Sequence, residues 1–266
     1  MNIYLYELRR LRLQTAIWIG VLGLASLMFI SLYPAFSSDM TVTQQLMQNM
    51  PPFAREMLGL SLSAFTTFLG FYSFTMIDIM LIGAAQAMGL GLGVMVREQQ
   101  SKTTDFLLTR PITRTRVFVA KCAAMLTAIL ITHTAYCVIV YVWVAVFKVG
   151  EFDNAKVMVV NASFLALQLW FMMLGIAVSQ LVHRVRSVVA YTLGAVFGLF
   201  AVGLIGALIG EEKFRYVSPF KYIDYLAYAS GGSIDAQYWL VGGLMALAML
   251  VGGYMLYTHR DKKAVA

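Results

Sequence analysis

Long uncharged apolar runs are the feature that most constrains the fold of this chain. Five runs, each bounded by charged residues, exceed the roughly 20 residues that a helix needs to cross the hydrocarbon core of a bilayer. A sixth run is interrupted by one charge, that of Asp78. The sequence therefore predicts six transmembrane helices, near residues 15–36, 68–96, 117–147, 157–182, 188–210 and 237–258.

The composition of the chain agrees with a polytopic membrane protein. Of the 266 residues, 60% are apolar and only 12% are charged, and the charged share is about half that of a typical soluble domain. A soluble protein of this size needs more polar surface than such a chain supplies. The runs also lack the short alternating pattern of barrel strands, so we expect an all-α fold.

The distribution of basic residues predicts the orientation in the cell membrane. Fourteen Lys and Arg residues fall on the side that holds both termini, and six fall on the other side. Cytoplasmic loops carry the excess of Lys and Arg, so both termini are expected in the cytoplasm. The net charge of +7 then follows from membrane topology, and we expect no nucleic-acid partner.

The spans divide the rest of the chain into segments with different expected roles. Residues 1–14 mix apolar and basic side chains, which suits an amphipathic interfacial helix on the lipid of the inner leaflet. The transmembrane domain is expected at 15–258. It includes an external segment at 39–67 and a long cytoplasmic loop at 97–116, and a short cytoplasmic tail follows at 259–266.

The cytoplasmic loop places apolar side chains outside the membrane. Ser101 can cap a short helix, and Pro111 ends that helix at or before Arg110. The helix carries the triplet Phe106 to Leu108 between charged residues. Leaving these side chains in water forgoes on the order of 1.5–3 kcal/mol each. The triplet therefore either docks into the groove of a partner or folds back onto its own protein or the lipid surface.

The loop and its flanks resemble the membrane subunit of an ATP-binding cassette (ABC) exporter of the type-2 ABC permease family. The residues that carry the resemblance are Glu98, Ser101, Lys102, Thr103, Phe106 to Leu108, Pro111-Ile112-Thr113-Arg114 and Lys121. Many members have Gly-Thr where this chain has Lys102-Thr103, which leaves the subfamily open.

The resemblance implies that the loop is a coupling element for a separate ATPase subunit. It implies a working unit of two permease subunits, identical or homologous, and two ATPase subunits. The positions expected to contact the ATPase are Glu98, Ser101, Lys102, Thr103, Asp105, Phe106, Leu107, Leu108, Arg110, Pro111 and Arg114.

The chain is not expected to be an enzyme. It has no G-x-x-x-x-G-K-[ST] motif to cradle phosphates, and no catalytic constellation or metal cluster. We expect no cofactor in this chain, whereas ATP and Mg²⁺ belong to the partner ATPase.

Small residues recur at helical spacing in the second and fifth predicted spans. Gly83, Ala87 and Gly91 share one face of the second span, and Gly194 and Gly198 share a face of the fifth. Such faces allow close packing of helices, either within one protomer or between two protomers that line a pathway.

Asp78 and His133 are the ionisable residues deepest in the predicted spans. Asp78 lies 19 residues before Arg97, and His133 lies 16 residues after Val117, so their depths differ by about one helical turn. These two residues can form a hydrogen-bonded pair, bind a cation or relay a proton. The alternatives are a purely structural pair, or an Asp78 in the outer vestibule.

Three other functions remain open beside the ABC permease. One is an intramembrane enzyme, for which Asp78 with His133 is the only candidate catalytic pair. A secondary transporter would use Asp78 and His133, although inverted repeats and broken helices are not evident. A membrane anchor that recruits a cytosolic protein would use the same loop. The sequence does not specify the transported substrate.

Overall fold

The protein is a helical bundle with six helices long and apolar enough to cross a membrane. The computed structural model describes residues 3–38, 67–100, 113–147, 149–182 and 185–259, with a few positions between 45 and 51. These described residues contain no strand, so the predicted all-α class is confirmed. The six helices are α1 (Ile3–Ser38), α5 (Phe68–Gln100), α7 (Arg114–Val146), α8 (Asn154–Leu181), α9 (Val188–Ile209) and α12 (Ala236–His259).

Helix α1 runs without interruption through the boundary expected near residue 14. The residues on both sides of that boundary are helix formers without Gly or Pro, so nothing ends the helix there. Glu7 and Leu11 in its first turns are buried. The segment expected to form a separate interfacial helix is therefore the start of α1, and it packs against the protein.

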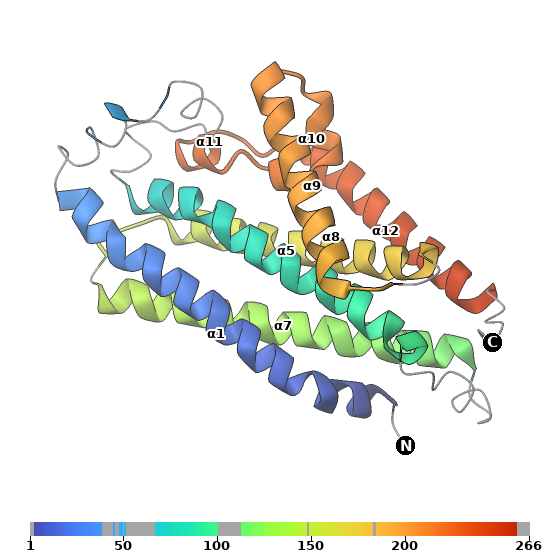
Figure 1. The fold of residues 1–266 in the computed structure, drawn as a ribbon. Coiled ribbons are helices and arrows are strands. Elements are labelled where there is room, and N and C mark those ends of the chain that lie inside the picture. Colours follow the sequence, from blue (N-terminus) through green and yellow to red (C-terminus); the bar gives the residue numbers. More distant parts are fainter. Residues whose placement is uncertain are drawn as a thin grey trace.

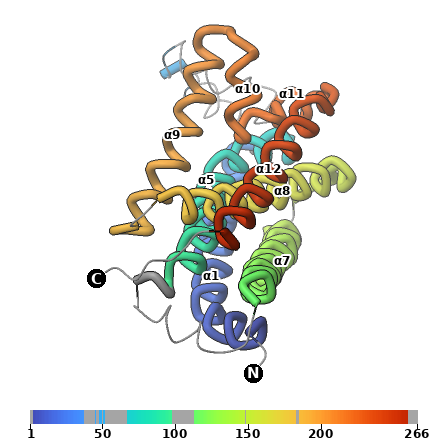
Figure 2. Tube along the Cα trace, turned by 90° about the vertical axis from the view of Figure 1, so that its right-hand side faces the viewer, coloured from blue at the N-terminus to red at the C-terminus, as the bar shows by residue number. Residues whose placement is uncertain are grey.

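Helices α1 and α7 lie side by side, and α5 packs most extensively against α8 (Figure 1). Helix α12 packs against α8. Helix α9 crosses α5 and then diverges from the other long helices toward the C-terminal end of α9 (Figures 1 and 2). The start of α1, the end of α5, the start of α7 and the end of α12 all lie at one end of the bundle (Figure 1). The loop expected to contact a partner thus connects two helices at the end where the described chain begins and ends.

The contact between α5 and α8 depends on glycine. A Cβ added to Gly91 would collide with the backbone carbonyl oxygen of Met172. A Cβ added to Gly175 would come within 2.6 Å of the carbonyl oxygen of Met88. The two backbones therefore touch, and helices approach this closely only where small residues meet.

Three short helices occupy the connection between α9 and α12. They are α10 (Lys213–Val217), the 3-10 helix η1 (Pro219–Lys221) and α11 (Tyr225–Ala229), which the sequence analysis did not predict. The connection turns back onto the bundle and packs closely on glycines of its two neighbours. Gly203 and Gly206 of α9 meet Ser218 and Phe214, and Gly242 of α12 meets the ring of Tyr222. This segment closes one side of the bundle end opposite the start of α1 (Figure 1).

Candidate functional site

The candidate site lies where α5 ends and α7 begins. Helix α7 starts at Arg114 because the Thr113 side chain accepts a hydrogen bond from the backbone amide of Arg116, a typical N-cap. Glu98 lies in the last turns of α5. The other expected contact residues lie outside the described residues: Ser101, Lys102, Thr103, Asp105, Phe106, Leu107, Leu108, Arg110 and Pro111.

A buried cluster of charges joins both flanks of this loop to α1. Glu7 is 4% exposed and Lys121 is 1% exposed. The Glu7 carboxylate lies 3.2 Å from Arg97 Nη1 and 3.7 Å from Lys121 Nζ. Lys121 also donates a 2.9 Å hydrogen bond to the carbonyl oxygen of Val94 on α5. One carboxylate of α1 thus neutralises cations from the end of α5 and the start of α7, which allows these charges to be buried.

A second set of contacts joins the start of α7 to the end of α12. Arg114 Nη1 donates a 3.1 Å hydrogen bond to the carbonyl oxygen of Thr258. Thr115 Oγ1 and Tyr254 Oη are 3.0 Å apart, and the ring of Phe118 packs edge-on against that of Tyr254. The two flanks of the loop are therefore in direct contact with α1 and α12.

Glu7 is the member of this cluster that the sequence analysis did not select. It is the only acidic residue among the first 38 residues. A lone carboxylate in an apolar and basic segment requires a partner, and this signal was available. The identity of its partners depends on which helices are neighbours, and only the tertiary structure shows this.

The structure does not pair Asp78 with His133. Asp78 is exposed on α5, and no basic side chain of the described residues lies within 4 Å of its carboxylate. His133 is buried on α7, where its ring packs near Phe164 and Nε2 lies 3.5 Å from Cys137 Sγ. No group of three or more potential metal ligands occurs in the described part of the chain. Asp78 instead faces away from its own protomer.

Replacing Asp78 by Asn is expected to leave the thermal stability of the purified protein unchanged within about 0.5 kcal/mol. Surface substitutions without a pairing partner usually have effects of this size. Thermal unfolding of the wild type and the variant in the same detergent measures this. A clear loss of stability in the variant would show that Asp78 has a structural partner, contrary to this geometry.

Uncharged polar residues form an intramembrane network that the sequence analysis also missed. Gln86 Nε2 donates a 2.9 Å hydrogen bond to Thr132 Oγ1, and Gln168 Nε2 donates a 3.2 Å hydrogen bond to Gln86 Oε1. The three buried residues come from α5, α7 and α8. A search of the spans for charged residues does not detect such uncharged polar residues. The network ties these helices together where unsatisfied polar groups are costly.

The two small-residue faces have different surroundings. Gly83 and Gly91 face Phe164 and the backbone of α8, and Ala87 between them is fully buried, so this face packs within the protomer. Nothing lies within 4 Å of a Cβ built on Gly194 or Gly198. The face of α9 that carries Gly194 and Gly198 is therefore not covered by other described residues of the protomer.

Comparison with protein families assigns the chain. The family model described as ABC-2 family transporter protein matches residues 1–262. Neither the search of curated proteins nor that of solved structures finds a match. The family match covers almost the whole chain, and it agrees with the six helices that can span a membrane. The chain therefore belongs to the ABC-2 family of transporter proteins and is a multi-pass membrane protein.

Proposed function

We propose that this chain is the permease subunit of an ABC exporter in the cell membrane. A separate ATPase subunit binds ATP and Mg²⁺. Residues 97–116 of the permease couple ATP hydrolysis in that subunit to substrate movement across the membrane. Family membership supports the permease role. The export direction and the cytoplasmic position of both termini rest on the sequence resemblance and on the distribution of basic residues.

The observation that carries the coupling role is the anchoring of both loop flanks. Arg97 on α5 and Lys121 on α7 share the carboxylate of Glu7 on α1. Arg114 bonds the last turn of α12. A loop that merely connected two spans would not need its flanks tied to two further helices. The same contacts allow closure of the ATPase to displace four helices together.

The open face of α9 is the place for a second permease copy. Gly194 and Gly198 lie there without a neighbour in the protomer. A stripe of small residues lets another helix approach closely in a membrane. Two permease copies and two ATPase subunits then make the working unit, with the substrate pathway between the permeases.

Replacing Phe106 and Leu107 by Asp is expected to reduce recovery of the partner ATPase at least tenfold. Two carboxylates would have to be desolvated in an apolar groove on the ATPase. The measurement is co-purification in detergent with a candidate cassette ATPase taken from the genes next to that of this chain. Equal recovery of the ATPase by the variant would contradict the coupling role of the loop.

A matched control separates this effect from the added charge. Ala264→Asp and Val265→Asp place the same two carboxylates in the expected cytoplasmic tail, and ATPase recovery should then stay at the wild-type level. Association of the ATPase without ATP-dependent transport in vesicles would instead identify a membrane anchor. Transport driven by an ion gradient without the ATPase would identify a secondary transporter.

A further inference from the structure

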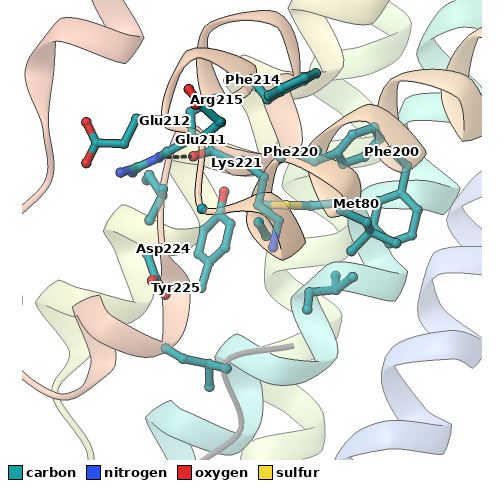
Figure 3. Close-up of a pocket in the computed structure, with 18 of the residues that line it drawn as sticks. Met80, Phe200, Glu211, Glu212, Phe214, Arg215, Phe220, Lys221, Asp224 and Tyr225 are labelled. Carbon is teal, nitrogen blue, oxygen red and sulfur yellow. Dashed lines mark hydrogen bonds between the residues drawn. The ribbon is translucent and has the colours of Figure 1, made fainter. Parts of the chain in front are cut away.

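A cavity of about 300 Å³ lies between α5, α9 and the segment that returns between α9 and α12. It is at the end of the bundle opposite the cluster around Glu7, among the side chains drawn in Figure 3. Its volume is at the lower end of the range of small-molecule sites. Its walls are held by the close contacts of α10 and η1 on the glycines of α9.

One wall of the cavity is apolar. It is formed by Met80 on α5, Phe200 on α9 and Phe220 on η1, whose side chains converge in Figure 3. The rings of Phe200 and Phe220 pack edge to face with centroids 5.5 Å apart. This surface suits an alkyl chain or another narrow apolar group.

Ser73 places a hydroxyl without a partner on the same cavity. The residue is 0% exposed, and its Oγ makes no hydrogen bond to any described residue. Buried hydroxyl groups are normally hydrogen-bonded, and a serine in a helix usually bonds a carbonyl of the preceding turn. Ser73 is therefore a buried hydroxyl in the cavity wall whose hydrogen-bonding capacity is not used by the described residues.

Lys221 places a positive charge at the cavity. Its side chain is half-buried and projects into the cavity beside Met80 (Figure 3). No carboxylate of the described residues lies within 4 Å of its ammonium group. Burial lowers the pKa of Lys221, while the negative charge of Asp224 acts in the opposite direction. An anion beside this ammonium group would replace the favourable interaction with water that the group loses on burial.

The other charges around the cavity are engaged elsewhere or face solvent. Arg215 lies 3.6 Å from the carboxylate of Asp235 and donates to the carbonyl oxygen of Lys221. The Asp224 carboxylate caps α11 through the amide of Ala227. Glu211 and Glu212 also line the cavity, but both are exposed. The ammonium of Lys221 is thus the inward charge that an occupant meets.

We propose that this cavity binds a single-chain amphiphile with an anionic head group. A phosphate or carboxylate head pairs with Lys221, Ser73 adds a hydrogen bond, and the chain lies along Met80, Phe200 and Phe220. Within the proposed permease function, on which this role rests, the cavity holds exported substrate on the far side of the membrane. The binding itself does not depend on that role.

The probe is radiolabelled dodecyl phosphate, with dodecyltrimethylammonium as the cationic counterpart. Saturable binding is measured on the full chain in phosphatidylcholine nanodiscs, after subtraction of binding to empty nanodiscs. Dodecyl phosphate should bind at least tenfold more tightly than the cation. Equal affinity for the two probes, or a preference for the cation, overturns the proposal.

Three variants test the residues. Lys221→Met removes the charge and shortens the side chain by one atom, and it should weaken dodecyl phosphate binding at least tenfold, with little effect on the cation. Lys213→Met removes an exposed charge from α10 that does not line the cavity, and it should bind as the wild type does. Ala207→Trp fills the cavity from α9 and should abolish saturable binding of both probes. Unchanged binding by Lys221→Met or by Ala207→Trp overturns the proposal.

The same preparations separate this inference from the permease function. Lys221→Met should still co-purify with the ATPase, because Lys221 lies at the opposite end of the bundle from the loop. ATPase association without amphiphile binding would remove only the cavity proposal. Amphiphile binding without ATPase association would remove the permease function and leave the site.

Discussion

Replacement of Gly91 by Val is expected to destabilise the protein by about 3 kcal/mol, the upper end of usual overpacking effects. Its Cβ would meet the carbonyl oxygen of Met172, so backbone rather than a flexible side chain would have to move. Gly175 makes the reciprocal approach to α5, which leaves α8 no room to yield. Loss of monodisperse protein after heating, followed by size exclusion in detergent, measures the effect.

The control for this prediction is Gly20→Val. Gly20 is an exposed residue of α1, and nothing lies within 4 Å of a Cβ at this position. The change of residue is identical, so any general effect of valine in a helix is shared. We expect Gly20→Val to stay within about 0.5 kcal/mol of the wild type. Equal stability of the two variants would show that α5 and α8 do not pack as described.

Replacement of Glu7 by Leu is expected to cost about 3–5 kcal/mol of stability, as for other buried ion pairs that lose one partner. The variant leaves Lys121, which is 1% exposed, and part-buried Arg97 without the shared carboxylate. The same change should weaken the link between α1 and both flanks of the loop at 97–116. Thermal unfolding in detergent and ATP-dependent transport in vesicles with the partner ATPase are the two readouts.

A second substitution distinguishes loss of the charge pair from loss of packing. Glu7→Leu combined with Lys121→Met also removes the buried lysine charge that Glu7 faces in the wild type, so the double variant should be more stable than Glu7→Leu alone. Glu151→Leu removes an exposed carboxylate and should change stability by no more than about 0.5 kcal/mol. A double variant less stable than the single one would mean that Lys121 has a stabilising role independent of Glu7.

The six membrane spans were accessible from the sequence because they depend on local properties. Whether a stretch can cross a bilayer is decided by the length and polarity of that stretch alone. The six predicted spans accordingly match six helices of the structure, within several residues at most ends. The boundary predicted near residue 14 lies inside α1, which already begins at Ile3.

The candidate site was accessible only in part. The loop at 97–116 was predicted from its apolar triplet and its family resemblance, and it stays a prediction because most of it lies outside the described residues. The sequence left open whether the small-residue stripe around Gly91 packs within one protomer or between two, and the structure places it against α8. Helical periodicity shows which residues share a face, and it does not show which neighbour that face meets.

The sequence by itself determined that this chain is a helical membrane protein with six spans, because the length and polarity of each apolar run are local properties of the sequence. Only the tertiary structure decided that Glu7 joins Arg97 and Lys121, that Asp78 and His133 are apart, and that Ser73 and Lys221 share a cavity. These relations depend on the rotation and crossing of helices distant in sequence. Such geometry is set by the packing of all six helices together.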